Sequence, residues 1–90
     1  MIKIRIPAQL RTLTGGSGEV SVEGSTVGEV LKALDAAHAG FADRIFDEAG
    51  ELRRFVNVFL DDEDVRFLEG LATPIAAGQT LSIVPAVAGG

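Results

Sequence analysis

Thr80-Leu81-Ser82-Ile83-Val84-Pro85, followed by Ala86-Val87-Ala88-Gly89-Gly90, is the most informative segment for the architecture of this chain. Leu81 and Ile83 alternate with Ser82 and Val84, which predicts a strand that turns Leu81 and Ile83 into the core and Ser82 and Val84 outward. Pro85 has no backbone N–H, so we expect it to end the pairing. An apolar strand at an open edge invites aggregation, so this last strand is expected to lie in the middle of a sheet.

One main helix is predicted upstream of this strand. Thr26, followed three residues later by Glu29, forms a capping box that satisfies free N–H groups at a helix start. Gly40 is expected to end the helix, and residues 41–51 suggest a further short helical turn. The apolar residues within the helix recur at helical spacing and form one stripe: Val27, Val30, Leu31 and Leu34.

The remaining strands are read from alternation of apolar and polar residues. Residues 2–6 and 19–23 alternate and flank a glycine-rich turn signal at 14–18, which predicts a hairpin with a long loop. Residues 55–60 (FVNVFL) are a strong strand signal. Residues 61–64 are expected to form a charged turn, and residues 65–67 a short edge strand. Residues 71–77 are expected to form a turn or 3₁₀ segment that begins near Pro74.

These elements predict an α+β fold of the β-grasp type. The helix has to bury its apolar stripe, and the inner face of a mixed sheet of about four to five strands is the only large partner. We therefore expect one domain at 1–85, with the main helix packed across the sheet, and a free, flexible tail at 86–90.

The composition restricts the function. Eight Lys and Arg against 13 Asp and Glu give a net charge of -5, which argues against nucleic acid as a partner. The chain has no cysteine, so it offers no disulfide and no thiolate nucleophile. No signal-peptide pattern and no apolar run long enough for a membrane span is present, so a cytoplasmic location is expected.

The interior of the chain holds no convincing catalytic or metal site. His38 is the only histidine and is expected to lie near the helix C-terminus in a surface or capping role. The acidic run at residues 61–64 lacks the alternating ligands and the glycine of a calcium loop. Residues 15–18 (GGSG) are followed by a strand and not by a lysine and a helix, so they do not form a phosphate loop. We therefore expect a carrier that is not an enzyme, binds no metal and holds no cofactor.

The candidate chemical site is the α-carboxylate of Gly90. The tail residues Ala86, Val87, Ala88 and Gly89 are small and uncharged, which suits an arm that threads into the narrow site of another enzyme. Glycine has no Cβ, which leaves the terminal carbonyl open to attack and the arm free to extend. Adenylation of this carboxylate would create a good leaving group, and sulfide or persulfide could then displace AMP to leave a thiocarboxylate.

Four motifs stand out along the chain: residues 54–57 (RFVN), 62–67 (DEDVRF), 70–73 (GLAT) and 82–90 (SIVPAVAGG). With the order of elements, they resemble the MoaD/ThiS family of ubiquitin-like sulfur carriers, and the similarity is greatest to the CysO-type carriers of thiocarboxylate-dependent cysteine biosynthesis. The resemblance covers almost the whole chain.

The resemblance implies a cycle with three partner proteins. An E1-like adenylyltransferase would use ATP to activate Gly90 and install sulfur. A pyridoxal-phosphate-dependent cysteine synthase would transfer that sulfur to an activated serine, and an acyl shift would leave cysteine in amide linkage to Gly90. A zinc metalloprotease would then release the cysteine. ATP, pyridoxal phosphate and zinc would belong to the partners and not to this chain.

Two departures from the family pattern keep alternatives open. The turn before the last strand is Ala77-Gly78-Gln79, where the family commonly has acidic-Gly-Asp, and Pro85 is followed by Ala86, where molybdopterin-type carriers often have a second proline. The alternatives are the small subunit of a molybdopterin synthase, a thiazole-type carrier, a ubiquitin-like protein modifier and a passive interaction module. The sulfur acceptor and the oligomeric state stay open.

A docking surface is predicted beside the tail. Val84 points outward and has the position, relative to the diglycine, at which the family places an apolar contact. Val56, Val58 and Leu60 share one face of their strand, so Phe55 and Phe59 share the other. Both faces cannot be core in so small a domain, which predicts either an apolar partner-docking patch at Val84, Phe59 and Phe55, or a loop that covers the two phenylalanines.

Overall fold

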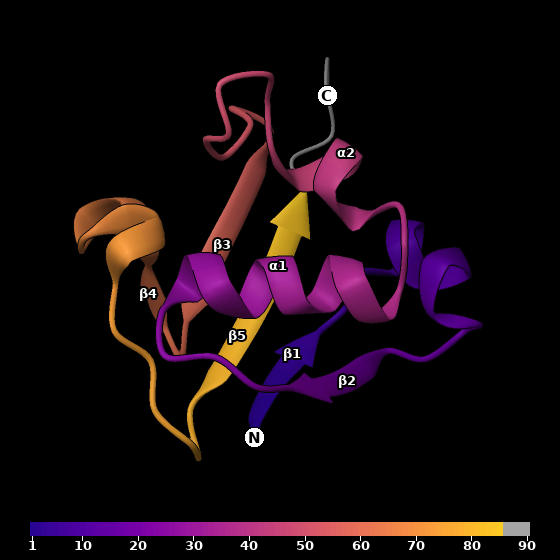
Figure 1. Cartoon of the computed structure of the whole chain (residues 1–90), viewed down its shortest axis with the longest axis horizontal. Helices are drawn as coiled ribbons and strands as arrows, with labels where there is room; N and C mark the ends of the chain where they lie inside the picture. Colours follow the sequence, from indigo (N-terminus) through magenta and orange to yellow (C-terminus); the bar gives the residue numbers. More distant parts are fainter. Residues whose placement is uncertain (86–90) are drawn as a thin grey trace.

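The computed structural model describes residues 1–85 of the 90-residue chain, and the predicted tail at 86–90 lies outside the described residues. The described part contains five strands, two α-helices and three 3₁₀ helices (Figure 1). In chain order they are β1 (Ile2–Arg5), η1 (Ala8–Thr14), β2 (Glu19–Val22), α1 (Val27–Ala37), α2 (Phe41–Ile45), β3 (Val56–Leu60), β4 (Glu63–Asp64), η2 (Val65–Phe67), η3 (Gly70–Ala72) and β5 (Thr80–Pro85).

The strands form one mixed sheet in the order β2-β1-β5-β3-β4. β5 is the central strand, as predicted, and pairs parallel with β1 and antiparallel with β3. The predicted hairpin is also present, because β1 and β2 pair antiparallel with Ile2 opposite Val22. Helix α1 lies across one face of this sheet (Figure 1), which confirms the predicted β-grasp architecture.

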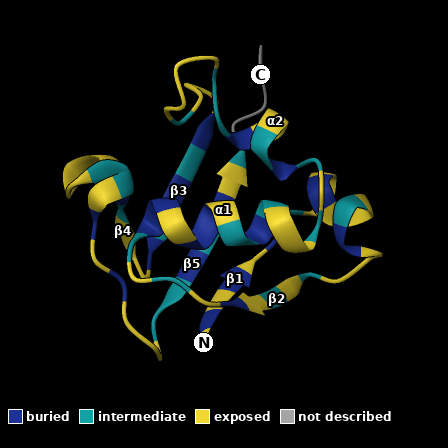
Figure 2. Cartoon of the chain, viewed as in Figure 1, coloured by how far each residue is buried: buried dark blue, intermediate teal, exposed yellow. Residues whose placement is uncertain are grey.

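The start of α1 follows from the predicted capping box. The Thr26 hydroxyl accepts a hydrogen bond from the Glu29 backbone N–H at 3.2 Å, and the Glu29 carboxylate accepts one from the Ser25 N–H at 2.9 Å. Buried and exposed residues alternate along α1 (Figure 2). All four residues of the predicted apolar stripe are fully buried: Val27, Val30, Leu31 and Leu34.

The predicted end of the helix at Gly40 is wrong. Helix α1 ends at Ala37, and Gly40 stands at the start of α2 with a φ of 110°. The Asp35 carboxylate accepts hydrogen bonds from the Gly40 N–H at 3.2 Å and the Ala42 N–H at 2.9 Å. This carboxylate satisfies free N–H groups at the start of α2, so the second helical turn predicted within 41–51 follows closely on the first helix.

The connection between β3 and β5 differs most from prediction. Residues 65–67 form the 3₁₀ helix η2 and not an edge strand, because the Asp64 carboxylate caps the Arg66 N–H at 2.8 Å and turns the chain. The edge strand is β4, which lies in the segment predicted as a charged turn. The later 3₁₀ turn, η3, comes before Pro74, which instead forms an isolated bridge with Thr26.

The long loop between β1 and β2 also contains a 3₁₀ helix, η1, that the sequence did not predict.

Candidate functional site

The strand that leads into the tail is held on both sides. Leu81 lies opposite Ile4 of β1, and Ile83 lies opposite Val58 of β3. Leu81 and Ile83 are buried in the core, as the alternation predicted. β5 is therefore paired with β1 over residues 80–82 and with β3 over residues 81–85, and its two inward side chains pack in the core.

The described part of the chain stops where β5 ends. Val84 lies opposite Asn57, and Pro85 lies opposite Val56 as the last paired residue of the strand. The predicted chemical group of Gly90 and the predicted tail residues lie outside the described residues, so their role stays a prediction. They are Ala86, Val87, Ala88 and Gly89.

The predicted docking residues lie on the outer side of the sheet, which faces away from α1. Val84 is 45% exposed and Phe55, just before β3, is 57% exposed, whereas Phe59 is half-buried. Phe59 pairs with Ser82, so Phe59 and Val84 are diagonal neighbours across β3 and β5. Within residues 1–85 no loop covers Phe55, and the sheet therefore presents apolar side chains close to the end of β5.

Arg66 is a component of this site that the sequence did not single out. Its guanidinium donates a hydrogen bond from Nη1 to the Asn57 Oδ1 at 3.0 Å and another from Nη2 to the Arg53 carbonyl at 2.7 Å. Asn57 is the residue opposite Val84. Arg66 therefore ties η2 to the end of β3 that lies opposite the end of β5. Its two hydrogen bonds join residues nine and 13 positions apart, which no local pattern reveals.

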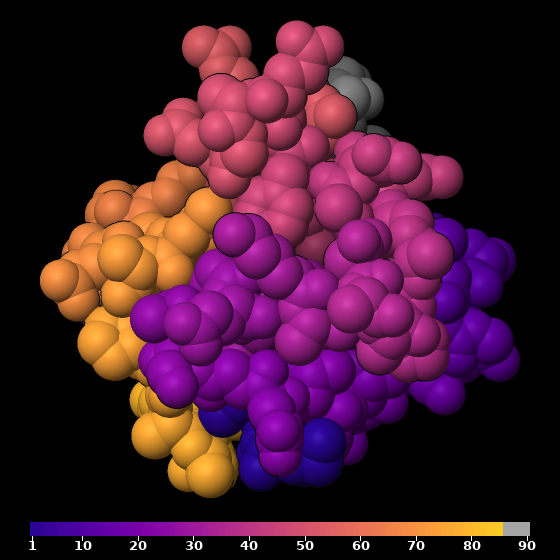
Figure 3. All heavy atoms as spheres, viewed as in Figure 1, coloured from indigo at the N-terminus to yellow at the C-terminus, as the bar shows by residue number. Residues whose placement is uncertain are grey.

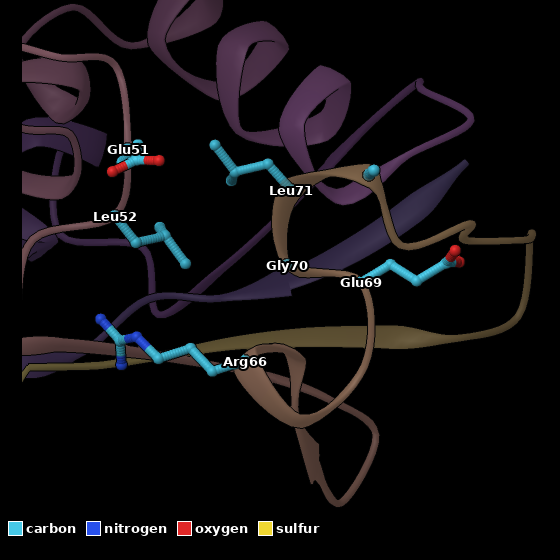
Figure 4. Close-up of a pocket in the computed structure, with 7 residues that line it drawn as sticks. Glu51, Leu52, Arg66, Glu69, Gly70 and Leu71 are labelled. Carbon is cyan, nitrogen blue, oxygen red and sulfur yellow. The ribbon is translucent and has the colours of Figure 1, made fainter.

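A hollow of about 460 Å³ lies between the segment before β3 and the segment η2–η3. Figure 4 shows the Arg66 side chain extending from η2 towards the segment that carries Glu51 and Leu52. Arg66 is already bonded to Asn57 and Arg53, and the other charged lining residues are Glu51 and Glu69. The guanidinium of Arg66 in this hollow is therefore engaged in structural hydrogen bonds.

The other residues considered from the sequence have structural roles. His38 is the C-cap of α1, where its backbone N–H donates to the Leu34 carbonyl at 2.8 Å. The Asp61 carboxylate accepts hydrogen bonds from the Thr80 N–H at 3.1 Å and the Gln79 amide at 3.3 Å. Within residues 1–85, no three His, Asp or Glu side chains gather as a metal site, and no helix has the length and apolar character needed to cross a membrane.

A comparison with known protein families identifies the family to which the chain belongs. The model described as "ThiS family" matches residues 4–90, which is nearly the whole chain. The chain belongs to the ThiS family. Within this family it is 48% identical to the protein named "Sulfur carrier protein CysO" from Mycobacterium tuberculosis, over 99% of this chain and 98% of that protein.

Solved structures and other relatives agree with this assignment. This ThiS-family chain matches a chain of the crystal structure of the Amycolatopsis orientalis BexX/CysO complex with a TM-score of 0.94 and 46% identity, over 100% of both chains. It is also 41% identical to the Haloferax volcanii "Small archaeal modifier protein 3", over 73% of this chain and 71% of that protein. The family resemblance read from the sequence is therefore confirmed, and the relatives include both sulfur carriers and ubiquitin-like modifiers.

Proposed function

We propose that this chain carries sulfur as a thiocarboxylate on Gly90 and donates it for cysteine biosynthesis. The observation that supports this function best is that the strand before the diglycine sequence, β5, is the central strand of the sheet and buries Leu81 and Ile83 in the core. The full-length similarity to a sulfur carrier, at 48% identity, supports the same proposal. The globular domain would act as a handle by which successive enzymes recognise one reactive terminus.

The proposed chemistry needs activation of the terminal carboxylate. An E1-like adenylyltransferase would join the Gly90 carboxylate to AMP from ATP and release pyrophosphate. Hydrosulfide would then attack the acyl carbon, form the C–S bond and expel AMP, with loss of one proton. The resulting thiocarboxylate holds nucleophilic sulfur without a cysteine, and the chain contains none.

The later steps would also be carried out by partners. A pyridoxal-phosphate-dependent cysteine synthase would accept the thiocarboxylate sulfur, and a zinc metalloprotease would regenerate the Gly90 carboxylate after the acyl shift to nitrogen. The carrier would contribute its shape and its terminus to each of these steps.

A second candidate function is protein modification through Gly90. The 41% identity to a small archaeal modifier protein supports it. Both functions would begin with the same adenylate, and they would differ in whether sulfide or a lysine amine attacks it. Conjugates that survive denaturing gels and disappear when Gly90 is removed would favour the modifier.

The direct test is intact-mass analysis of the protein purified from its native host. We expect a fraction of the molecules to show the mass increase produced by exchange of one oxygen for one sulfur, and fragmentation to place that sulfur on Gly90. Incubation with a cysteine synthase and an activated serine should then replace the mass of the thiocarboxylate form by that of the protein with cysteine attached to Gly90. A complete absence of the sulfur form under sulfur-replete and sulfur-limited growth would contradict the proposal.

Substitution of Val84 tests the docking surface. We expect Val84→Asp to lower kcat/KM for sulfur loading by about 10–100-fold, because a carboxylate would be buried without a partner against an apolar contact. Val84 is 45% exposed, so the fold should persist. The matched control is Ser21→Asp, on the exposed side of β2 at the far edge of the sheet. Equal loading of both variants would contradict the assignment of Val84.

A further inference from the structure

Phe67 is the most exposed of the large apolar residues in the described part of the chain, at 87%. Its neighbour Leu68 is 39% exposed. Both lie at η2, which with η3 forms one side of the molecule next to β4 (Figures 1 and 3). An exposed phenylalanine beside an exposed leucine marks a place where another surface can bury apolar area.

This part of the chain is held firmly, so the exposure of Phe67 is not the result of a loose loop. Val65 is fully buried, and the Asp64 carboxylate caps the Arg66 N–H at 2.8 Å. The Arg66 guanidinium is bonded to Asn57 and to the Arg53 carbonyl. Phe67 is therefore presented by a backbone whose preceding residues are fixed, which reduces the entropy lost on binding.

The charge around Phe67 indicates the kind of partner. Asp62, Glu63 and Glu69 are exposed, and none of their carboxylates makes a hydrogen bond or ion pair within residues 1–85, where Lys3 with Glu19 is the one ion pair. Residues 86–90 carry no cationic side chain that could neutralise them. Leu68 also lines, with Asp62 and Glu63, a hollow of about 370 Å³. An apolar patch with unpaired carboxylates fits an apolar pocket bordered by lysine or arginine.

We propose that Phe67 and Leu68, bordered by Asp62, Glu63 and Glu69, form a second docking surface for the adenylating enzyme. The inference rests on the proposed function. An enzyme that binds ATP together with a carboxylate tail needs cationic groups around its site, and such a surface attracts these carboxylates. Arg66, the residue before Phe67, is bonded to Asn57, which lies opposite Val84, so η2 is anchored to the strand beside the first docking surface. Contact at both would fix the rotation of the carrier as well as its position.

The test measures binding of the full chain to its cognate adenylating enzyme by calorimetry and stopped-flow kinetics. We expect Phe67→Ala to raise Kd about 10-fold or more, as loss of an aromatic anchor does. We expect the triple variant Asp62→Asn, Glu63→Gln, Glu69→Gln to slow association several-fold at low salt and to weaken its salt dependence. The matched control, Glu23→Gln, Asp43→Asn, Glu48→Gln, removes the same charge from exposed positions outside the patch and should stay within about twofold of the wild type.

Two results would overturn the inference. One is a Kd for Phe67→Ala within twofold of the wild-type value, and the other is an equal effect of the two triple variants. Sulfur loading of the wild type, measured in the same preparation by intact mass, separates this failure from failure of the proposed function. If the wild type loads normally and Phe67→Ala binds as tightly as the wild type, only the second docking surface is contradicted. If the wild type neither binds nor loads, both proposals are contradicted.

Discussion

A chain that ends at Ala88 is expected to acquire no measurable sulfur. Removal of Gly89 and Gly90 shortens the arm by about 7 Å in extended geometry, so the new carboxylate cannot reach the position at which the partner forms the adenylate. Misplacement of a reacting group by a single ångström can already cost about 100-fold in rate. The measurement is ATP–pyrophosphate exchange with the cognate adenylating enzyme, followed by intact mass.

Two controls distinguish the effect of a shorter arm from an effect on the fold or on steric access to the terminal carbonyl. Thermal unfolding of the truncated chain should match the wild type, because the deletion leaves β5, which ends at Pro85, unchanged. The variant Gly89→Ala, Gly90→Ala keeps the length but adds Cβ atoms, so it should show intermediate loading if access to the carbonyl matters. Full activity of the truncated chain would show that the diglycine is not the reactive terminus.

The second large effect is expected on stability. Leu81→Ala should lower the free energy of unfolding by about 2–5 kcal/mol, because it removes a fully buried side chain and leaves a cavity. For a domain of this size, each kcal/mol corresponds to a fall in Tm of about 4–8 °C. Leu81 lies in the central strand opposite Ile4 and Leu60, so the cavity opens at the junction of three strands. Urea unfolding followed by circular dichroism gives the value.

Val84→Ala is the matched control for Leu81→Ala. It truncates an apolar residue of the same strand, but one that is 45% exposed on the outer face, so its effect on unfolding should stay within about 0.5 kcal/mol. The two variants should also separate in function, since Val84→Ala is expected to weaken loading while the folded part of the Leu81→Ala population loads normally. Equal destabilisation by the two would contradict the inward and outward assignment of β5.

Local patterns predicted the regular elements well. The cap at Thr26 with its apolar stripe, the alternation around Leu81 and the run at 55–60 each depend on neighbours within a few residues, so they could be read directly. Residues 61–77 were predicted less well. There the apolar–polar–apolar residues 65–67 suggested a strand, but they form a 3₁₀ turn that is capped by Asp64. The early end of α1 was missed for a similar reason, since the Asp35 carboxylate bonds across a turn to Ala42.

Periodicity and the cost of an unpaired apolar edge were enough to predict the β-grasp architecture and the inward side of β5, and the structure confirms both. The role of the glycine terminus in acyl chemistry stays a prediction from the sequence. The exposure of Phe55 and Phe67 and the hydrogen bonds of Arg66 to Asn57 and Arg53 could be found only in the folded molecule. Exposure and long-range hydrogen bonds depend on which distant segments pack together, whereas strand and helix preferences depend on adjacent residues.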